Sequence, residues 1–165
     1  GSVSLSAHQS PLMGSATWLT QPEWIQMLGP FDLDPACPPE MPWKTAERML
    51  TPKDDGLATP WQGRVWLNPP FGRYAREWMR KMAHHGNGIA LVSARTETAM
   101  FFESVWPKAD AVCFVHGRPH FYRPDGTRAK FNSGAPIALV AYGWNNKQRL
   151  RDAALGATVL DWGML

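Results

Sequence analysis

Short apolar runs alternate with amphipathic stretches along this chain, and the alternation predicts strands and helices in turn. The continuous apolar run at residues 89–92 is typical of a strand buried on both faces. Trp78 and Met82, four residues apart, are typical of one face of a helix. Strands are expected at about 31–34, 64–67, 89–92, 111–115, 137–142 and 157–160. Helices are expected at about 22–28, 74–85, 98–106 and 145–155, with a further helical stretch at 43–50.

Glycine and proline divide these segments. Gly29-Pro30 is expected to end the first helix, and Gly86 the second. Pro124-Asp125-Gly126 predicts the turn of a hairpin that spans residues 120–131. Strands that alternate with helices favour a three-layer α/β fold.

The chain of 165 residues predicts a single domain over residues 17–165. Residues 1–16 are Ser-rich and aperiodic, and they are expected to form a flexible arm that begins with an expression scar, Gly1-Ser2. No signal peptide and no apolar run long enough to span a membrane is visible, so we expect a soluble, cytoplasmic protein without a membrane partner.

Composition adds little to the functional picture. The net charge of +3 is compatible with nucleic acid but does not demand it, while nine Trp leave candidates for base stacking. Cys37 and Cys113 have neither metal-ligand spacing nor a disulfide framework, so both are expected to be reduced and buried. His116 and His120 lack an acidic or Cys partner at metal spacing, and no metal is expected.

The most informative segment is Asn68-Pro69-Pro70-Phe71, directly after an apolar strand. The Asn68 side-chain oxygen and the Pro69 carbonyl can each accept a hydrogen bond from an exocyclic –NH₂ group, which aims the nitrogen lone pair at an electrophile. The prolines fix the turn, and the Phe71 ring offers a face for stacking a planar base. An ordinary turn at the end of a strand is the alternative.

Two upstream segments suit a cofactor. Thr20 is placed to cap a helix that has Pro22 in its first turn, and a helix N-terminus attracts a carboxylate. Asp34 ends the first expected strand, where an acidic side chain can bind a ribose hydroxyl or an ammonium group. Carboxylate, ammonium and ribose are all parts of S-adenosylmethionine.

Five blocks, in this order, resemble those of the small phage-type (Dam-like) DNA N6-adenine methyltransferases, a branch of the Rossmann-like methyltransferases. The resemblance covers about residues 17–142, and the ordered set is far more specific than any one block. The blocks are Thr20-Gln21-Pro22; Asp34-Pro35-Ala36-Cys37; Asp55-Gly56-Leu57 with Trp61 and Asn68-Pro69-Pro70-Phe71; Ala94-Arg95-Thr96-Glu97-Thr98 with Phe101-Phe102; and Gly117-Arg118-Pro119-His120-Phe121.

The resemblance implies a compact Rossmann-like sheet with helices on both faces, S-adenosylmethionine as cofactor and DNA as partner. It also implies a bacterial cytoplasm, as for a phage-encoded enzyme, and a monomer or weak homodimer. The implied catalytic residues are Asn68, Pro69, Pro70 and Phe71, and the implied cofactor residues are Thr20, Pro22, Asp34, Pro35, Ala36 and Asp55. By spacing alone, Asp55 would be read as part of a turn before Gly56. Many relatives continue the second block into a glycine-rich turn, but this chain has Pro38-Pro39, and we expect a modest cofactor affinity.

The predicted hairpin carries several cations beside aromatic residues. The ordinary interpretation is a solvated surface hairpin. The functional alternative is a loop that contacts DNA beside the base pocket. The DNA-binding candidates are Arg118, Phe121, Arg123, Arg128 and Lys130.

The expected activity is therefore methyl transfer from S-adenosylmethionine to adenine N6 in DNA, after the base has flipped out of the helix. Two alternatives stay open. One is the same chemistry on another amino group, such as cytosine N4, an RNA base or a protein glutamine. The other is a catalytically silent nucleic-acid-binding domain of the same fold.

Overall fold

The computed structural model describes residues 19, 21–70, 72–123, 125–132, 134–153 and 158–160. The predicted arm at 1–16, Thr20 and Phe71 lie outside these residues. The helices are α2 (Pro22–Leu28), α3 (Ala75–His85), α4 (Trp144–Ala153), the 3₁₀ helix η1 (Pro52–Asp54) and the π-helix η2 (Phe101–Val105). The strands are β1 (Leu33–Asp34), β2 (Arg48–Met49), β3 (Val65–Leu67), β4 (Gly88–Ser93), β5 (Ala111–Phe114), β6 (His120–Tyr122), β7 (Arg128–Asn132), β8 (Ile137–Tyr142) and β9 (Thr158–Leu160).

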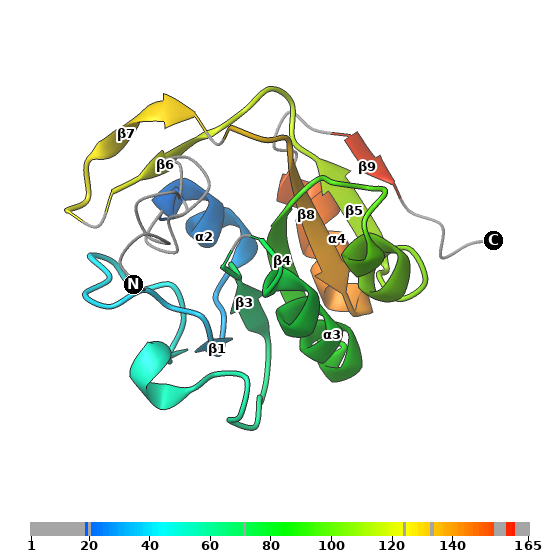
Figure 1. The fold of residues 1–165 in the computed structure, drawn as a ribbon, viewed down its shortest axis with the longest axis horizontal. Coiled ribbons are helices and arrows are strands. Elements are labelled where there is room, and N and C mark those ends of the chain that lie inside the picture. The colour runs from blue at the N-terminus through cyan, green and yellow to red at the C-terminus, as the bar shows by residue number, and fades with distance from the viewer. Residues whose placement is uncertain are drawn as a thin grey trace, which may run out of the picture.

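Seven strands form one mixed sheet in the order β2-β1-β3-β4-β8-β5-β9 (Figure 1). The first four are parallel to one another, with Leu33 opposite Val65 and Trp66 opposite Ile89. β8 is inserted antiparallel between β4 and β5, and β9 pairs antiparallel with β5. The strand β4, which contains the apolar run at 89–92, thus has a parallel neighbour on one side and an antiparallel one on the other.

Different helices cover the two faces of the sheet. Alternate residues of β4 point to opposite faces: Ala90 belongs to the apolar cluster formed with α3 and η2, and Ile89 to the cluster formed with α2 and α4. In Figure 1, α3 lies in front of the sheet and α4 behind β8 and β5. The expectation of a mixed α/β fold is confirmed.

Two helix predictions need correction. The stretch at 43–50 is not a helix: it contains β2, whose flanking residue Leu50 donates its N–H to the Asp34 carbonyl while Cys37 donates to the Leu50 carbonyl. Pairing with the edge of β1 overrides any local helical preference. In the stretch at 98–106, residues 101–105 form a π-helix rather than an α-helix, and the Trp106 N–H bonds to the Phe101 carbonyl at 2.9 Å.

The second, two-stranded sheet is the predicted hairpin of β6 and β7. It lies apart from the main sheet in Figure 1. Leu19 forms an isolated antiparallel bridge with Tyr122, and the Gln21 side chain donates to the His120 carbonyl at 3.0 Å. The segment before α2 is therefore attached to the hairpin.

The start of α2 also differs from the expectation. Gln21, and not Thr20, occupies the N-cap position, and its side chain forms no capping hydrogen bond. Pro22 is the first helical residue, as predicted, because its fixed φ suits that position and its missing N–H is not needed there. Among the described helices, none combines the length and apolar character that a membrane span requires.

Candidate active site

The candidate site lies at the carboxyl ends of β1 and β3. From β1 the chain moves outward to β2, then returns to place β3 on the other side of β1. The strand order therefore reverses between β1 and β3. Crevices at such switch points, outside the carboxyl ends of parallel strands, are the usual ligand sites of open α/β sheets.

Asp34 ends β1 and is almost fully buried, with 3% of its surface exposed. Its Oδ2 accepts a hydrogen bond from the Thr45 hydroxyl at 2.5 Å, and its Oδ1 accepts one from the Ala36 N–H at 3.2 Å. Burial raises the pKa of Asp34 to about 6, although both hydrogen bonds act in the opposite direction. No Lys or Arg of the described residues forms an ion pair with this carboxylate.

Thr45 is the residue of this site that sequence reasoning missed. It is 4% exposed and lies in the segment that the sequence predicted to be helical. No local sequence signal marks it, since an isolated Thr in a Pro-rich stretch is unremarkable. Its role follows only from the return of the chain from β1 to β2, which places its hydroxyl on Asp34.

Pro35 and Gly56 bring two of the sequence blocks into contact. A Cβ added to Gly56 would lie 2.0 Å from the Pro35 carbonyl oxygen, so only glycine fits this approach. Trp61 donates its Nε1–H to the Gly56 carbonyl at 2.8 Å. The glycine and the tryptophan of this block therefore hold its loop against the turn that follows Asp34.

Lys81 of α3 forms hydrogen bonds with the same loop. Its Nζ donates to the carbonyls of Leu57 and Thr59, both at 2.6 Å, and it lies 5.1 Å from the Trp61 ring centroid. Trp61 is also stacked on Trp78 of α3, with ring centroids 6.3 Å apart. The loop is thus packed on α3 and fixed by both polar and aromatic contacts.

Asp55 begins this loop in the left-handed conformation, with φ of 50°. Its carboxylate is exposed, and its Oδ1 accepts a bond from the Ala58 N–H at 3.4 Å. This geometry matches a turn residue. A role for Asp55 in binding a cofactor stays a prediction.

Replacing Gly56 by alanine is expected to lower the melting temperature and to weaken cofactor binding together. The new methyl group would overlap the Pro35 carbonyl and push the loop away from the Asp34 turn. Thermal unfolding and calorimetry with S-adenosylhomocysteine measure the two effects. Ala58→Gly, at an exposed position of the same loop, is the control. A Gly56→Ala protein with wild-type stability would contradict the close approach.

Asn68, Pro69 and Pro70 follow β3 directly, on the strand adjacent to β1. Pro69 is buried, whereas Asn68 and Pro70 are half-buried. The structure therefore brings Asn68 and Asp34 to the ends of neighbouring parallel strands. Phe71 lies outside the described residues, so its stacking role stays a prediction.

The hairpin is packed onto the segment that carries Thr45. Tyr122 meets Trp43 edge to face with ring centroids 5.5 Å apart, and Gly126 faces the side chains of Pro42 and Trp43. A short stretch of chain thus joins the hairpin to the Asp34 site.

The hairpin cations are exposed where their side chains are described. Arg118 donates to the Gly134 carbonyl at 3.3 Å, and Arg128 lies 3.0 Å from His120 Nδ1. Arg123 is exposed, and its backbone N–H donates to the Thr127 carbonyl at 2.7 Å. For Phe121 and Lys130 the structure describes the strand positions, in β6 and β7, and not the side chains.

Within the described part of the chain, no group of three or more His, Cys, Asp or Glu could hold a metal ion. Cys37 and Cys113 are both buried and free, as predicted, and burial raises the pKa of each thiol, to about 12 and about 11. His85 Nε2 lies 2.8 Å from the Gly63 carbonyl oxygen, and the His85 and Trp61 rings meet edge to face with centroids 5.9 Å apart.

The model of a family described as DNA N-6-adenine-methyltransferase (Dam) matches residues 17–152, which is most of the chain. The comparison with curated proteins gave no match, and neither did the comparison with solved structures.

Proposed function

Because the chain belongs to the DNA N-6-adenine-methyltransferase (Dam) family, we propose that it transfers a methyl group from S-adenosylmethionine to N6 of adenine in DNA. The observation that carries the proposal is the placement of Asp34 and Asn68 at the ends of adjacent parallel strands, on either side of the switch point. One residue suits a cofactor, the other an amino group, and methyl transfer requires both ligands side by side.

The buried carboxylate of Asp34 fits the cofactor. It has no cationic partner among the described side chains, and both of its hydrogen bonds favour the ionised form. A ligand that brings a hydroxyl group or a positive charge would compensate for its burial. S-adenosylmethionine has both, and when bound it supplies an activated methyl group. Pro35 and Ala36 form the turn beside it, and Asp55 and Thr20 are further candidate cofactor residues.

The Asn68-Pro69 segment fits the reacting amino group. The Asn68 Oδ1 and the Pro69 carbonyl would accept hydrogen bonds from N6 and orient its lone pair toward the methyl group. Transfer to N6 would leave S-adenosylhomocysteine as the leaving group, and the proton lost from N6 would pass to solvent. Positioning and electrostatics supply most of the acceleration. Pro70 fixes the turn, and Phe71 would stack on the flipped base.

The sheet order supports a Rossmann-like methyltransferase arrangement with three layers. Four parallel strands continue into an antiparallel insertion, and helices cover both faces. Residues 17–165 would form this single domain.

Identification of the methylated product tests the proposal. The protein is incubated with labelled S-adenosylmethionine and double-stranded DNA, and the nucleosides are separated after digestion. Labelled N6-methyl-2′-deoxyadenosine would support the proposal. Labelled N4-methylcytosine, or label only in RNA or protein, would assign the same chemistry to another amino group. Folded protein that binds no cofactor would indicate a catalytically silent domain.

The basic hairpin is proposed to contact the DNA backbone near the target base. Neutralising Arg123, Arg128 and Lys130 together is expected to flatten the slope of log K against log salt by about 2–3 units, since each phosphate contact contributes roughly 0.9. Binding should weaken equally on all sequences, because phosphate contacts carry no base information. DNA binding measured over a series of salt concentrations checks this. An unchanged slope would leave the hairpin as an ordinary solvated surface.

A further inference from the structure

One face of α3 carries two arginines and a histidine that the proposed function does not use. Arg76 and Arg80 are four residues apart, as are Arg80 and His84, so the three share one face of the helix. At ~1.5 Å rise per residue they are spaced by about 6 Å.

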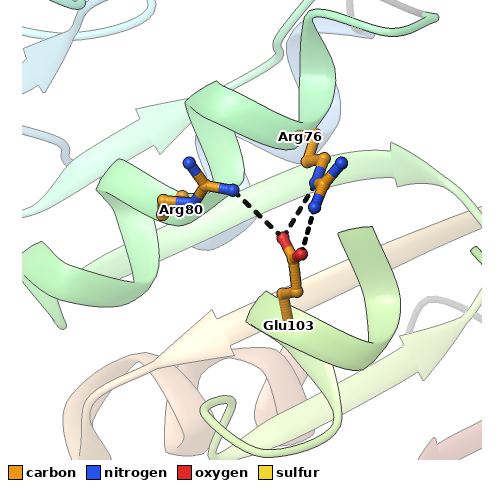
Figure 2. Close-up of polar contacts among 3 residues, drawn as sticks. All are labelled: Arg76, Arg80 and Glu103. Carbon is orange, nitrogen blue, oxygen red and sulfur yellow. Dashed lines mark hydrogen bonds and ion pairs between the residues drawn. The ribbon is translucent and has the colours of Figure 1, made fainter. Parts of the chain in front are cut away.

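A single carboxylate from the π-helix neutralises part of this row. Glu103 binds Arg76 in a bidentate manner: Oε2 accepts from Nε at 2.9 Å, and Oε1 from the second guanidinium nitrogen. Arg80 donates to Oε2 at 3.3 Å. Figure 2 shows both arginines converging from α3 on this one side chain of η2. Two cations thus share one anion, and the cluster keeps an excess positive charge.

A hollow of about 620 Å³ opens beside this cluster. Arg80, Ala83 and His84 line it from α3, and Glu103, Ser104 and Lys108 line it from η2 and the turn that follows. Lys108 is exposed and forms no ion pair with any described residue. Glu103 is the only carboxylate among these lining residues. The hollow is therefore an open, positively charged groove along α3.

The geometry of Glu103 resembles that of a bound phosphate. Bidentate contact with a planar guanidinium is common to carboxylates and phosphates. The cluster is exposed, and exposed ion pairs contribute little to stability, so the need to fold does not account for two arginines on one acid. An extended row also suits a polyanion better than a small ligand, since a DNA strand has one phosphate per ~3.4 Å of helix axis and cations about 6 Å apart can meet alternate phosphates.

We propose that the groove between α3 and η2, with Arg76, Arg80 and Lys108, binds the phosphate backbone of the substrate DNA, and that Glu103 occupies a phosphate position in the free protein. This inference rests on the proposed function, because it takes DNA as the polyanion. DNA binding then requires the ion pairs of Glu103 with Arg76 and Arg80 to break. Glu103 thereby limits the affinity for DNA that the groove would otherwise have.

Two variants with opposite expected effects test the inference. Glu103→Gln keeps the shape of the side chain and frees two cations, so it should tighten binding to a short duplex and steepen the salt slope by up to about 2 units. Arg80→Gln with Lys108→Gln should weaken binding and flatten the slope by a similar amount. Fluorescence anisotropy with a labelled duplex measures both. A misfolded protein cannot account for tighter binding.

Glu47→Gln is the matched control. It makes the same change in net charge and also breaks an exposed ion pair, that with Lys44 at 3.1 Å, away from α3. The inference is overturned if Glu103→Gln binds DNA with the affinity and salt slope of Glu47→Gln. If the wild type methylates DNA, but Glu103→Gln and the double variant Arg80→Gln with Lys108→Gln have the wild-type slope of log K against log salt, only the groove is ruled out as a DNA-binding surface. If neither the wild type nor Glu103→Gln binds or methylates DNA, the proposed function fails as well.

Discussion

Replacing Asn68 by alanine is expected to slow methyl transfer by roughly 10²–10³-fold while leaving cofactor binding largely intact, which is the usual cost of one lost charge-positioning group. Asn68 would supply one of the two acceptors on the reacting nitrogen. Without it, the Pro69 carbonyl alone cannot fix the direction of the lone pair. Asp34 lies on the neighbouring strand, and its hydrogen bonds to Thr45 and Ala36 do not involve Asn68.

The measurement is single-turnover transfer from tritiated cofactor to DNA, together with calorimetric binding of S-adenosylhomocysteine. Asn68→Asp is the matched variant, since a carboxylate oxygen at the same place still accepts a hydrogen bond from N6. It should retain far more activity than Asn68→Ala. Near-normal turnover by Asn68→Ala would remove this residue from the chemistry.

The long buried strands could be predicted from the sequence. The run at 137–142 coincides with β8, and the run at 89–92 lies inside β4. Both strands are buried along almost their whole length, so continuous apolar character is their signature. β1 and β2 have only two residues each, and their existence depends on pairing between distant segments. The residues near β2 do not indicate that this segment will pair with β1. Local pattern alone therefore predicts a helix there.

The candidate site divides in the same way. The placement of Asp34 and Asn68 was predictable because Asp34 ends one apolar strand and Asn68 follows another, and the carboxyl ends of parallel strands meet at one edge of a sheet. Thr45 was not, because its hydroxyl reaches Asp34 only after the chain has turned back. The ion pairs of Glu103 with Arg76 and Arg80 form only because η2 packs against α3, and η2 is a π-helix. Tertiary contacts of this kind leave no periodic trace in the sequence.

The second large effect concerns Asp34, where stability and cofactor binding are expected to change in opposite directions. Burial raises the pKa of Asp34 from the ordinary 3.8 to about 6. Between these values the folded protein holds a proton that the unfolded chain has lost. Its free energy of unfolding therefore falls as the pH rises through this window. At about 1.4 kcal/mol per pKa unit, the loss amounts to about 3 kcal/mol above pH 6.

Asp34→Asn is therefore expected to stabilise the cofactor-free protein at pH 8 and to remove this part of the pH dependence. Asparagine has nearly the same shape, and its amide can still bond to Thr45 and Ala36. Thermal unfolding between pH 4 and pH 8 measures the change. Thr45→Val is the companion variant. It removes a hydrogen bond that lowers the pKa of folded Asp34, so the upper limit of the pH window should rise while the lower limit stays the same. Identical pH profiles for all three proteins would show that Asp34 does not titrate as its burial demands.

The same Asp34→Asn substitution should weaken S-adenosylhomocysteine binding, measured by calorimetry at pH 8. A neutral amide cannot offer the negative charge that an ammonium group requires, and it accepts a weaker hydrogen bond from a hydroxyl group. A variant that is more stable and yet binds less tightly would indicate that the buried charge is retained for the ligand rather than for the fold. Binding as tight as that of the wild type would remove Asp34 from the cofactor site, and the family's second sequence block would then have only a structural role in this chain.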